Sequence, residues 1–287
     1  MNNKYWKMAK KMTGFPLFAA ALVALALVFL MSCEKADNNI TAANASTLKL
    51  YLTDGPADYQ AVWIDIQKVM VHLSGDTTVE SGWQEIPIAT RGLLNLAQLR
   101  NGADTLLAEA EVPAGDISDI RLMLGNRNAV VLDNGDSVAL LIPSGDDKQI
   151  NLEVNNAALQ PGVPFELVLD FDLAHSLHVP ARSDSGNYML TPNIRVFAKG
   201  AGASIRGWVL PDSAHAHVLA VSPFNDTITT IPDAPGGFFK LWGIPQGTYT
   251  LYIVPDSATG YAADTLLDIA AVQGKMATTD TIRLEKK

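Results

Sequence analysis

The acidic pair in Asp170-Phe171-Asp172 is the arrangement most suggestive of chemistry. On a β-strand, residues i and i+2 share a face, so both carboxylates could bind one hard cation such as Ca²⁺. Asp54 and Asp58 could join them only if the fold brings the segments together. Calcium prefers about six to eight oxygen ligands, and the sequence has no EF-hand spacing. We therefore favour the alternative in which Phe171 packs inward while the aspartates face water or cap a following turn.

Two histidine pairs have spacings that occur in metal sites. His175 and His178 would share a face only in a helix, and a helix should not continue into Val179-Pro180. His215 and His217 would share a strand face, as zinc or copper pairs do, but no third ligand is evident. We expect these histidines to face solvent, and we expect no metal and no cofactor.

Tryptophans are the candidate ligand-binding residues, because sugar rings stack on indoles. Trp208 follows Gly207 in an apolar alternation that should point it outward, and Trp242 precedes a turn. These two are the better candidates for a sugar-binding surface. Trp63, inside an apolar strand, is expected in the core. Ordinary packing is the simpler alternative for all of them, Trp83 included.

No catalytic residue is assigned from the sequence. It contains no Gly-x-Ser-x-Gly elbow, no His-Glu-x-x-His and no glycine-rich phosphate loop opening a helix. We therefore expect a protein that is not an enzyme. Because glycosidase carboxylates have no local signature, a carbohydrate-active enzyme using Asp170 and Asp172 is the alternative from another class.

The first 32 residues have the pattern of an export signal. Four lysines precede an apolar stretch from Phe15 to Met31, and the chain turns polar after Cys33. Leu30-Met31-Ser32-Cys33 resembles the lipobox of bacterial lipoproteins, which implies cleavage before Cys33 and lipidation of its thiol. The alternative is an uncleaved membrane helix, for which the apolar stretch is at the short limit.

Composition limits the possible partners and chemistry. Cys33 is the only cysteine, so the remaining chain can form no disulfide and no zinc–thiolate site. Removal of the signal's four lysines changes the formal net charge from −9 to −13. A protein this acidic, without a basic run, is a poor nucleic-acid binder. It would be held at a membrane by its lipid.

The pattern of apolar residues predicts two β-sandwich domains after a flexible tether at 33–46. Period-two alternation fills 47–198, including one expected strand at 187–197 and a hairpin turn at 133–136. Residues 93–99 and 105–110 favour helix and are interpreted as short helical or irregular connections. A glycine-rich joint, 199–203, precedes a second run of strand patterns over 203–287.

The first block resembles the DUF4382 domain of bacterial lipoproteins, a family without an assigned function. The resemblance covers residues 47–197. It rests on Leu50-Tyr51-Leu52-Thr53-Asp54-Gly55-Pro56-Ala57-Asp58-Tyr59, Trp63-Ile64-Asp65-Ile66, Gly82-Trp83, Asn101-Gly102, Pro113-Ala114-Gly115, Ile117-Ser118-Asp119-Ile120-Arg121-Leu122, Leu169-Asp170-Phe171-Asp172 and Leu190-Thr191-Pro192-Asn193-Ile194-Arg195-Val196.

The second block is similar to the carboxypeptidase regulatory-like, or transthyretin-like, β-sandwich. The similarity rests on Ile205-Arg206-Gly207-Trp208-Val209, Gly236-Gly237-Phe238-Phe239, Leu241-Trp242-Gly243-Ile244-Pro245-Gln246-Gly247-Thr248-Tyr249-Thr250-Leu251, Gly260-Tyr261 and Ile282-Arg283-Leu284. This resemblance implies a non-catalytic appendage.

The sequence thus predicts a non-enzymatic lipoprotein of the cell envelope that presents binding or structural β modules. The expected location is the outer membrane, on its periplasmic or surface face, with the anchor at Cys33. The membrane is the expected partner through the lipid, together with a glycan or an envelope protein, and nucleic acid is not expected. A carbohydrate-binding or carbohydrate-active surface protein remains the alternative.

Overall fold

The structure is a computed structural model that describes residues 44–55, 59–74, 82–143, 148–179, 188–224 and 226–287. Residues 41–287 form one compact unit. The predicted export signal, Cys33 and most of the tether lie outside the described residues, as does Asp58. Within the described ranges, no helix is long and apolar enough to cross a membrane.

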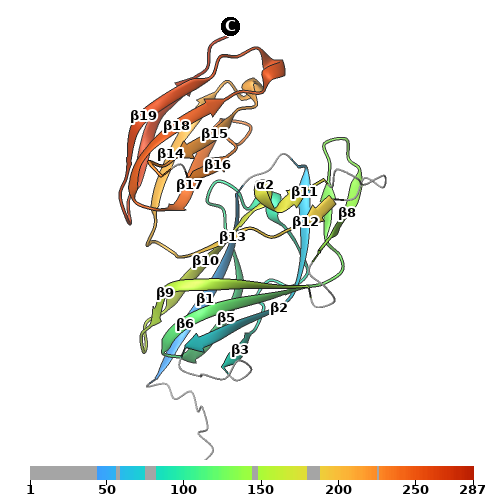
Figure 1. Ribbon diagram of the computed structural model, residues 1–287, viewed down its shortest axis with the longest axis vertical. Coiled ribbons are helices and arrows are strands. Elements are labelled where there is room, and N and C mark those ends of the chain that lie inside the picture. Colours follow the sequence, from blue (N-terminus) through green and yellow to red (C-terminus); the bar gives the residue numbers. More distant parts are fainter. Residues whose placement is uncertain (1–43, 56–58, 75–81, 144–147, 180–187, 225) are drawn as a thin grey trace, which may run out of the picture. The chain divides into compact units, whose positions relative to one another are not determined.

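Residues 45–198 form two sheets (Figure 1). The smaller sheet has the order β13-β10-β1-β5. Its strands are β1 (Ala45–Gly55), β5 (Thr105–Pro113), β10 (Phe165–Asp172) and β13 (Ile194–Ala198). The larger sheet has the order β11-β12-β8-β7-β2-β6-β9, and β3 and β4 also pair with β2. Its strands are β2 (Ala61–Ser74), β3 (Trp83–Ile86), β4 (Leu93–Asn95), β6 (Gly115–Leu124), β7 (Ala129–Val131), β8 (Ser137–Leu141), β9 (Gln149–Leu159), β11 (Leu177–His178) and β12 (Tyr188–Leu190).

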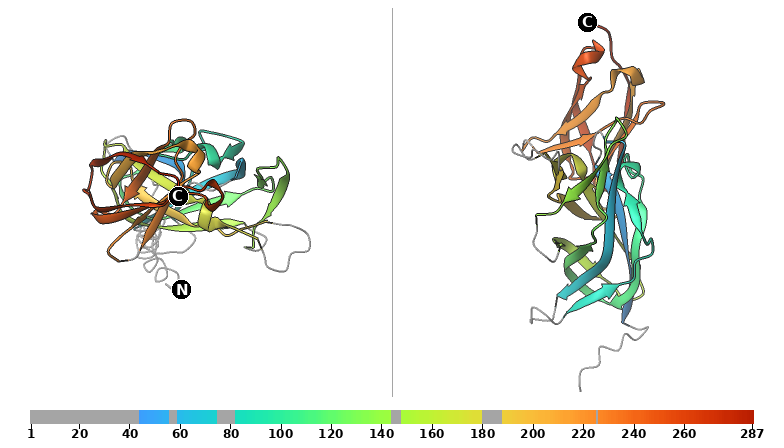
Figure 2. Two further views of the ribbon diagram at one scale, coloured as in Figure 1. Left: turned by 90° about the horizontal axis from the view of Figure 1, so that it is seen from above. Right: turned by 90° about the vertical axis from the view of Figure 1, so that its right-hand side faces the viewer.

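Residues 203–287 form two further sheets, ordered β17-β14-β20 and β16-β15-β18-β19. Their strands, orange to red, are grouped together in Figures 1 and 2. They are β14 (Ala203–Leu210), β15 (His217–Val221), β16 (Thr227–Thr230), β17 (Phe238–Ile244), β18 (Gly247–Val254), β19 (Asp264–Ala271) and β20 (Met276–Arg283). The short helices of the chain are η1 (Leu96–Gln98), α2 (Leu173–Ser176), η2 (Asp212–Ala214) and η3 (Ser257–Thr259).

Alternation along the strands builds two separate apolar clusters. In β1, Leu48, Leu50 and Leu52 are fully buried while the residues between them are half-buried. One cluster contains these leucines and Phe171, and the other contains Phe239 and its neighbours in residues 203–284. The prediction of an all-β fold of sandwich type is confirmed, and so is the inward packing of Phe171. The division into two independent domains stays a prediction.

Three local expectations can be compared with the structure. The turn at 133–136 is confirmed: it joins β7 to β8, with Gly135 at φ 86° and its N–H donating to Leu132. The helical interpretation of 105–110 is wrong, because these residues form β5, whose pairing with β1 overrides helix propensity. The single strand expected at 187–197 is also wrong. Pro192 lies in a break between β12 and β13, which belong to different sheets.

A buried carboxylate on β2 holds the turn that follows β6. The side chain of Asp65 is 2% exposed, and Arg127 donates to it from Nε and Nη2 at 3.0 Å each. The amide of Asn128 links the same turn, since its oxygen accepts the Asp65 N–H at 2.8 Å. The guanidinium, which is mostly exposed, holds the pKa of Asp65 below its usual value, with Gln67 adding a further hydrogen bond.

Replacing Asp65 by asparagine should lower the free energy of unfolding at pH 7 by about 1–2 kcal/mol, because charge-assisted hydrogen bonds are lost. A carboxyl with a lowered folded pKa stabilises the fold above its unfolded pKa of about 3.9, and this contribution is lost as the pH falls through the folded value. Urea unfolding at several pH values should therefore show the difference from wild type shrinking below about pH 4. Glu85→Gln, which removes the exposed 2.7 Å ion pair with Lys68, is the matched control. Its effect should stay below about 0.5 kcal/mol, and an equal loss in both variants would contradict the argument.

Candidate functional site

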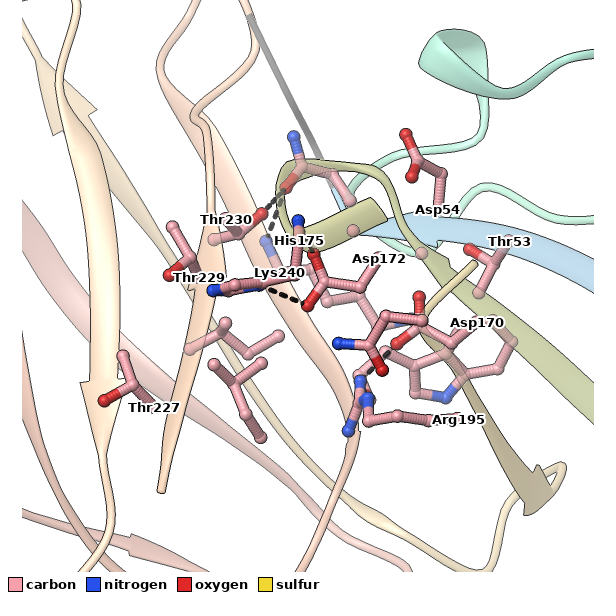
Figure 3. A pocket seen from close by; sticks show the side chains of 17 residues that line it. Thr53, Asp54, Asp170, Asp172, His175, Arg195, Thr227, Thr229, Thr230 and Lys240 are labelled. Carbon is pink, nitrogen blue, oxygen red and sulfur yellow. Dashed lines mark hydrogen bonds and ion pairs between the residues drawn. The ribbon is translucent and has the colours of Figure 1, made fainter. Parts of the chain in front are cut away.

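Parallel pairing between β1 and β10 brings the acidic residues of the sequence to one end of the smaller sheet. Thr53 lies beside Asp170, and Gly55 lies beside Asp172. Side chains from residues 203–287 face this end of the sheet, and a pocket of about 270 Å³ lies between them (Figure 3). We call it the junction pocket. Its polar lining residues are Thr53, Asp54, Asn101, Asp170, Asp172, His175, Asn193, Arg195, Thr227, Thr229, Thr230 and Lys240, and Trp242 also lines it.

The negative charge of Asp170 is balanced within the pocket by a neighbouring cation. Its carboxylate forms an ion pair with Arg195 on the neighbouring strand β13, and the same guanidinium nitrogen lies 3.4 Å from the carbonyl oxygen of Trp242. Burial raises the pKa of Asp170, and Arg195 opposes that rise. The expectation that both aspartates face water or cap a turn is therefore wrong for Asp170, because the side chain is buried and paired.

Asp172 caps the short helix α2, as the favoured interpretation expected. Its Oδ1 accepts the backbone N–H of His175 at 3.2 Å, and its Oδ2 lies 2.7 Å from His175 Nδ1. The short helix ends at Ser176, which leaves His178 at an exposed strand position. The two histidines thus do not share a helical face, and only His175 lines the pocket.

Asp54 belongs to the same end of β1 but points the other way. Successive residues of a strand alternate between faces, so Asp54 lies opposite Thr53, and Figure 3 shows its carboxylate directed away from Asp170 and Asp172. It is 4% exposed, and neither carboxylate oxygen has a hydrogen-bond partner. Burial raises the pKa of Asp54 well above its usual value, and the charges of Asp170 and Asp172 raise it further, while the nearby backbone N–H of Leu173 and the charge of Arg100 oppose the rise.

Because of these contacts, the carboxylates of Asp54, Asp170 and Asp172 do not point toward one common position. Among the described residues there is no group of three or more His, Cys, Asp or Glu side chains that could hold a metal ion. The cation candidates Asp170 and Asp172 instead bind Arg195 and His175. The second histidine pair lines another pocket, of about 550 Å³, with Asp212, Asp233 and Asp256. His215 there has φ 44°, and its ring is exposed, as expected.

Asn101 connects the two halves of the described chain, and the sequence was informative about it only as a turn residue. Its side-chain nitrogen donates to the carbonyl of Ile231 at 2.9 Å. Its side-chain oxygen accepts from Thr230 Oγ1 at 2.9 Å and from the backbone N–H of Lys240 at 3.1 Å. Both β16 and β17 are therefore held by one buried amide. Arg100 adds an ion pair with Asp233 at 2.9 Å.

Trp242 is half-buried at this contact. Its ring meets Phe197 edge-on at 5.7 Å between centroids, and the ammonium of Lys240 lies 4.6 Å from its ring. The ammonium of Lys199 lies 5.9 Å from the centroid of the Trp242 ring, and it forms an ion pair with the Asp104 carboxylate at 2.9 Å. Gly243, at φ 62°, follows directly, and a Cβ there would collide with the Phe197 ring. Trp242 thus contributes to packing between β17 and β13 as well as to the pocket.

The other tryptophans that the structure describes lie outside the pocket. Trp208 is half-buried on the face of β14 opposite the core, as the alternation predicted, with its ring 5.6 Å from that of Phe238. Trp83 lies under Arg121, whose guanidinium carbon is 4.0 Å from the ring centroid. The core placement expected for Trp63 is wrong, because Val62 and Ile64 occupy the buried face and Trp63 faces the other side.

The described chain is an all-β protein of sandwich type with a polar pocket where its two groups of strands meet. It belongs to the family described as "Domain of unknown function (DUF4382)", whose model matches residues 45–192. No curated protein matches the chain.

Comparison with solved structures gives matches of low sequence identity and low TM-score. The Bacillus anthracis TIE protein is 13% identical, with 85% of this chain and 34% of that chain covered and a TM-score of 0.22. GBS52, the minor pilin of Streptococcus agalactiae, is 10% identical, with 83% of this chain and 96% of that chain covered and a TM-score of 0.23. The fimbrial anchor protein Mfa2 from Porphyromonas gingivalis is 11% identical, with 79% of this chain and 82% of that chain covered and a TM-score of 0.17. The chain thus spans about a third of the length of the first of these.

Proposed function

We propose that the protein is a non-enzymatic lipoprotein of the cell envelope, anchored through Cys33, that presents its C-terminal β region away from the membrane. The observation that carries this proposal is the course of strand β1. It begins at Ala45, shortly after the proposed anchor, and ends at Gly55, where the junction pocket meets residues 203–287. The C-terminal region is proposed to be a carboxypeptidase regulatory-like module, on the residues that resemble that family.

The dimensions agree with such a role. Strand β1 is 11 residues long, which corresponds to about 33–36 Å between its ends. From Cys33 to Asn44 the chain can extend by at most about 40 Å. A folded unit on a tether of this length could hold its C-terminal strands clear of lipid headgroups. The contacts of Asn101 and Arg100 support this role, because they fasten the C-terminal strands to the anchored half.

Replacing Cys33 by serine should abolish lipidation and the cleavage before residue 33 that the lipobox resemblance implies, so the apolar stretch from Phe15 to Met31 stays on the chain. The full chain with a C-terminal tag would be expressed in a host that has signal peptidase II and grown with labelled palmitate. Wild type should carry the label and have the mass of the cleaved form, and Cys33→Ser should carry no label and keep the mass of the uncleaved precursor. Label on the variant, or an unlabelled wild type, would contradict the lipid anchor.

The side of the membrane is tested separately by protease shaving of intact cells. We propose an outer-membrane location, with the periplasmic and surface faces as the two arrangements. Digestion of the tagged C-terminal region in intact cells would assign the surface, and protection until the outer membrane is opened would assign the periplasm. Co-fractionation with the inner membrane would contradict the outer-membrane location.

Glycan binding is the second candidate function, and the position of Trp208 favours it. Its ring is half-exposed on the outer face of a sheet, where an indole can stack on a sugar. A carbohydrate-active enzyme is less well supported, because Asp170 and Asp172 are paired with Arg195 and His175. A test of glycan binding must also consider the cations Arg206 and Lys240, which lie on the strands that carry Trp208 and Phe238.

A further inference from the structure

The outer face of the sheet β17-β14-β20 carries aromatic and cationic side chains in adjacent rows. Cross-strand pairing places Trp208 beside Phe238, and Arg206 beside Lys240. The residues between them along each strand, such as Gly207 and Phe239, are buried. The two rows are separated by two residues along each strand, which is about 7 Å. We call these four residues the basic-aromatic face.

Acidic side chains balance the two cations of this face only in part, through the charge of Asp104 near Lys240. Neither Arg206 nor Lys240 forms an ion pair with any side chain that the structure describes. Arg206 donates from Nε to Thr278 Oγ1 at 3.1 Å, which leaves its other N–H groups available. Like charges directly opposite each other on neighbouring strands are destabilising. Partial burial lowers the pKa of Lys240, the charge of Asp104 opposes this shift, and the charges of Arg206 and Lys199 lower the pKa further.

Such a pair is unusual in this chain because acidic residues outnumber basic ones, 30 to 21. Two adjacent cations that repel each other would be neutralised by an anionic ligand, and charge complementarity is a common basis of recognition. Trp208 and Phe238, tilted by 59° with 5.6 Å between centroids, supply a half-exposed aromatic surface beside the cations. The face thus combines ring stacking with charge pairing at about 7 Å.

The shape and charge of the protein select among anionic partners. The face is the side of a sheet, whereas peptides are recognised at sheet edges and in grooves. Nucleic acid carries one negative charge per about 1.7 Å of duplex, and a chain with a formal charge of −9 would repel it strongly. A sugar polymer with about one carboxylate per ring presents less charge, and its rings suit an indole.

We propose that the basic-aromatic face binds a polysaccharide carrying carboxylate groups, with Trp208 stacking on a sugar ring and Arg206 and Lys240 pairing with carboxylates. The proposal deepens the role of a binding module proposed above, and it does not depend on the lipid at Cys33. Binding by a Cys33→Ser protein that carries no lipid would separate the two.

Binding is tested with the full chain purified in detergent and polygalacturonate as the probe, by isothermal titration. We expect saturable binding that weakens as salt is raised. Trp208→Ala should weaken it by about tenfold or more, and the double variant Arg206→Gln/Lys240→Gln should weaken it at least as much and reduce the salt dependence. The double variant keeps side chains that are polar and of similar length, including at Lys240, which also lines the junction pocket, so it remains informative if Trp208→Ala is unstable. Thermal unfolding checks each variant.

The matched control is Lys286→Gln, because Lys286 lies 4.6 Å from the Tyr261 ring in the same group of strands but outside the face. It should leave affinity unchanged. Absence of binding to polygalacturonate, or binding unaffected by both variants, would overturn the proposal. Equal affinity for neutral dextran would overturn the role of the cations. Tighter binding of single-stranded DNA with the same dependence on these residues would identify a polyphosphate site and overturn the assignment to a carboxylated glycan.

Discussion

Asn101→Ala should lower the free energy of unfolding by about 2–4 kcal/mol and uncouple the C-terminal strands from the rest of the protein. Alanine removes three hydrogen bonds, and it leaves the N–H of Lys240 and the carbonyl of Ile231 without partners, at about 1–3 kcal/mol for each buried group. Asn101 also has φ 56°, a region that asparagine tolerates better than alanine. Calorimetry should show one transition for the wild type and two for the variant.

Asn101→Gly separates the backbone contribution from that of the amide. Glycine adopts positive φ without strain, so the loss that remains in this variant reports the missing amide. Asn134→Ala, in the exposed turn at 133–136, is the control for removing an asparagine that bonds only to its own turn. If Asn101→Ala still unfolds in a single transition at an unchanged temperature, Asn101 does not couple the two groups of strands.

The importance of Asn101 could not be derived from the sequence, although its turn could. Asn101-Gly102 has the composition of a tight turn, and that local property was readable. Its partners, Thr230, Ile231 and Lys240, are about 130 residues away in the chain. No periodicity or spacing indicates which loop meets which strand at such separation.

The same distinction explains the outcome for the acidic residues. Alternation correctly placed Phe171 in the core and Asp172 at a cap, because both depend on neighbours along the chain. Burial of Asp170 depends on Arg195 from β13, which is 25 residues further along the chain and is not indicated by the pattern around Asp170. The helix prediction for residues 105–110 was wrong for a related reason, because their pairing with β1 is a contact between distant segments that local propensity does not indicate. Local pattern predicted the strands, and contacts between distant strands determined the pocket.

Asp54→Asn should increase stability at neutral and alkaline pH. The Asp54 carboxyl is 4% exposed, and neither oxygen has a hydrogen-bond partner, so its charged form is poorly solvated. Asparagine has the same shape without the charge. We expect the free energy of unfolding at pH 8 to rise by about 1–3 kcal/mol, because the wild-type carboxyl must bind a proton or bury a charge on folding and the amide does neither. Urea unfolding of both proteins from pH 4 to pH 8 measures the difference.

The pH dependence provides the sharper test. A carboxyl whose pKa is higher in the folded than in the unfolded state must bind a proton on folding. Its effect on stability is therefore neutral below the unfolded pKa of about 3.9, and it becomes increasingly unfavourable as the pH rises toward the folded value. Asp54 should thus make wild-type stability fall with rising pH, and the advantage of Asp54→Asn should grow over the same interval. Asp170, whose pKa is also raised, is present in both proteins, and Asp65 titrates at lower pH.

The exposed Asp280 supplies the control, since Asp280→Asn should change stability by no more than about 0.5 kcal/mol at any pH. If Asp54→Asn is less stable than wild type at pH 8, the Asp54 carboxylate has a favourable partner when ionised. A constant difference across the whole pH range would instead mean that the variant acts through packing, and that the ionisation of Asp54 does not oppose folding.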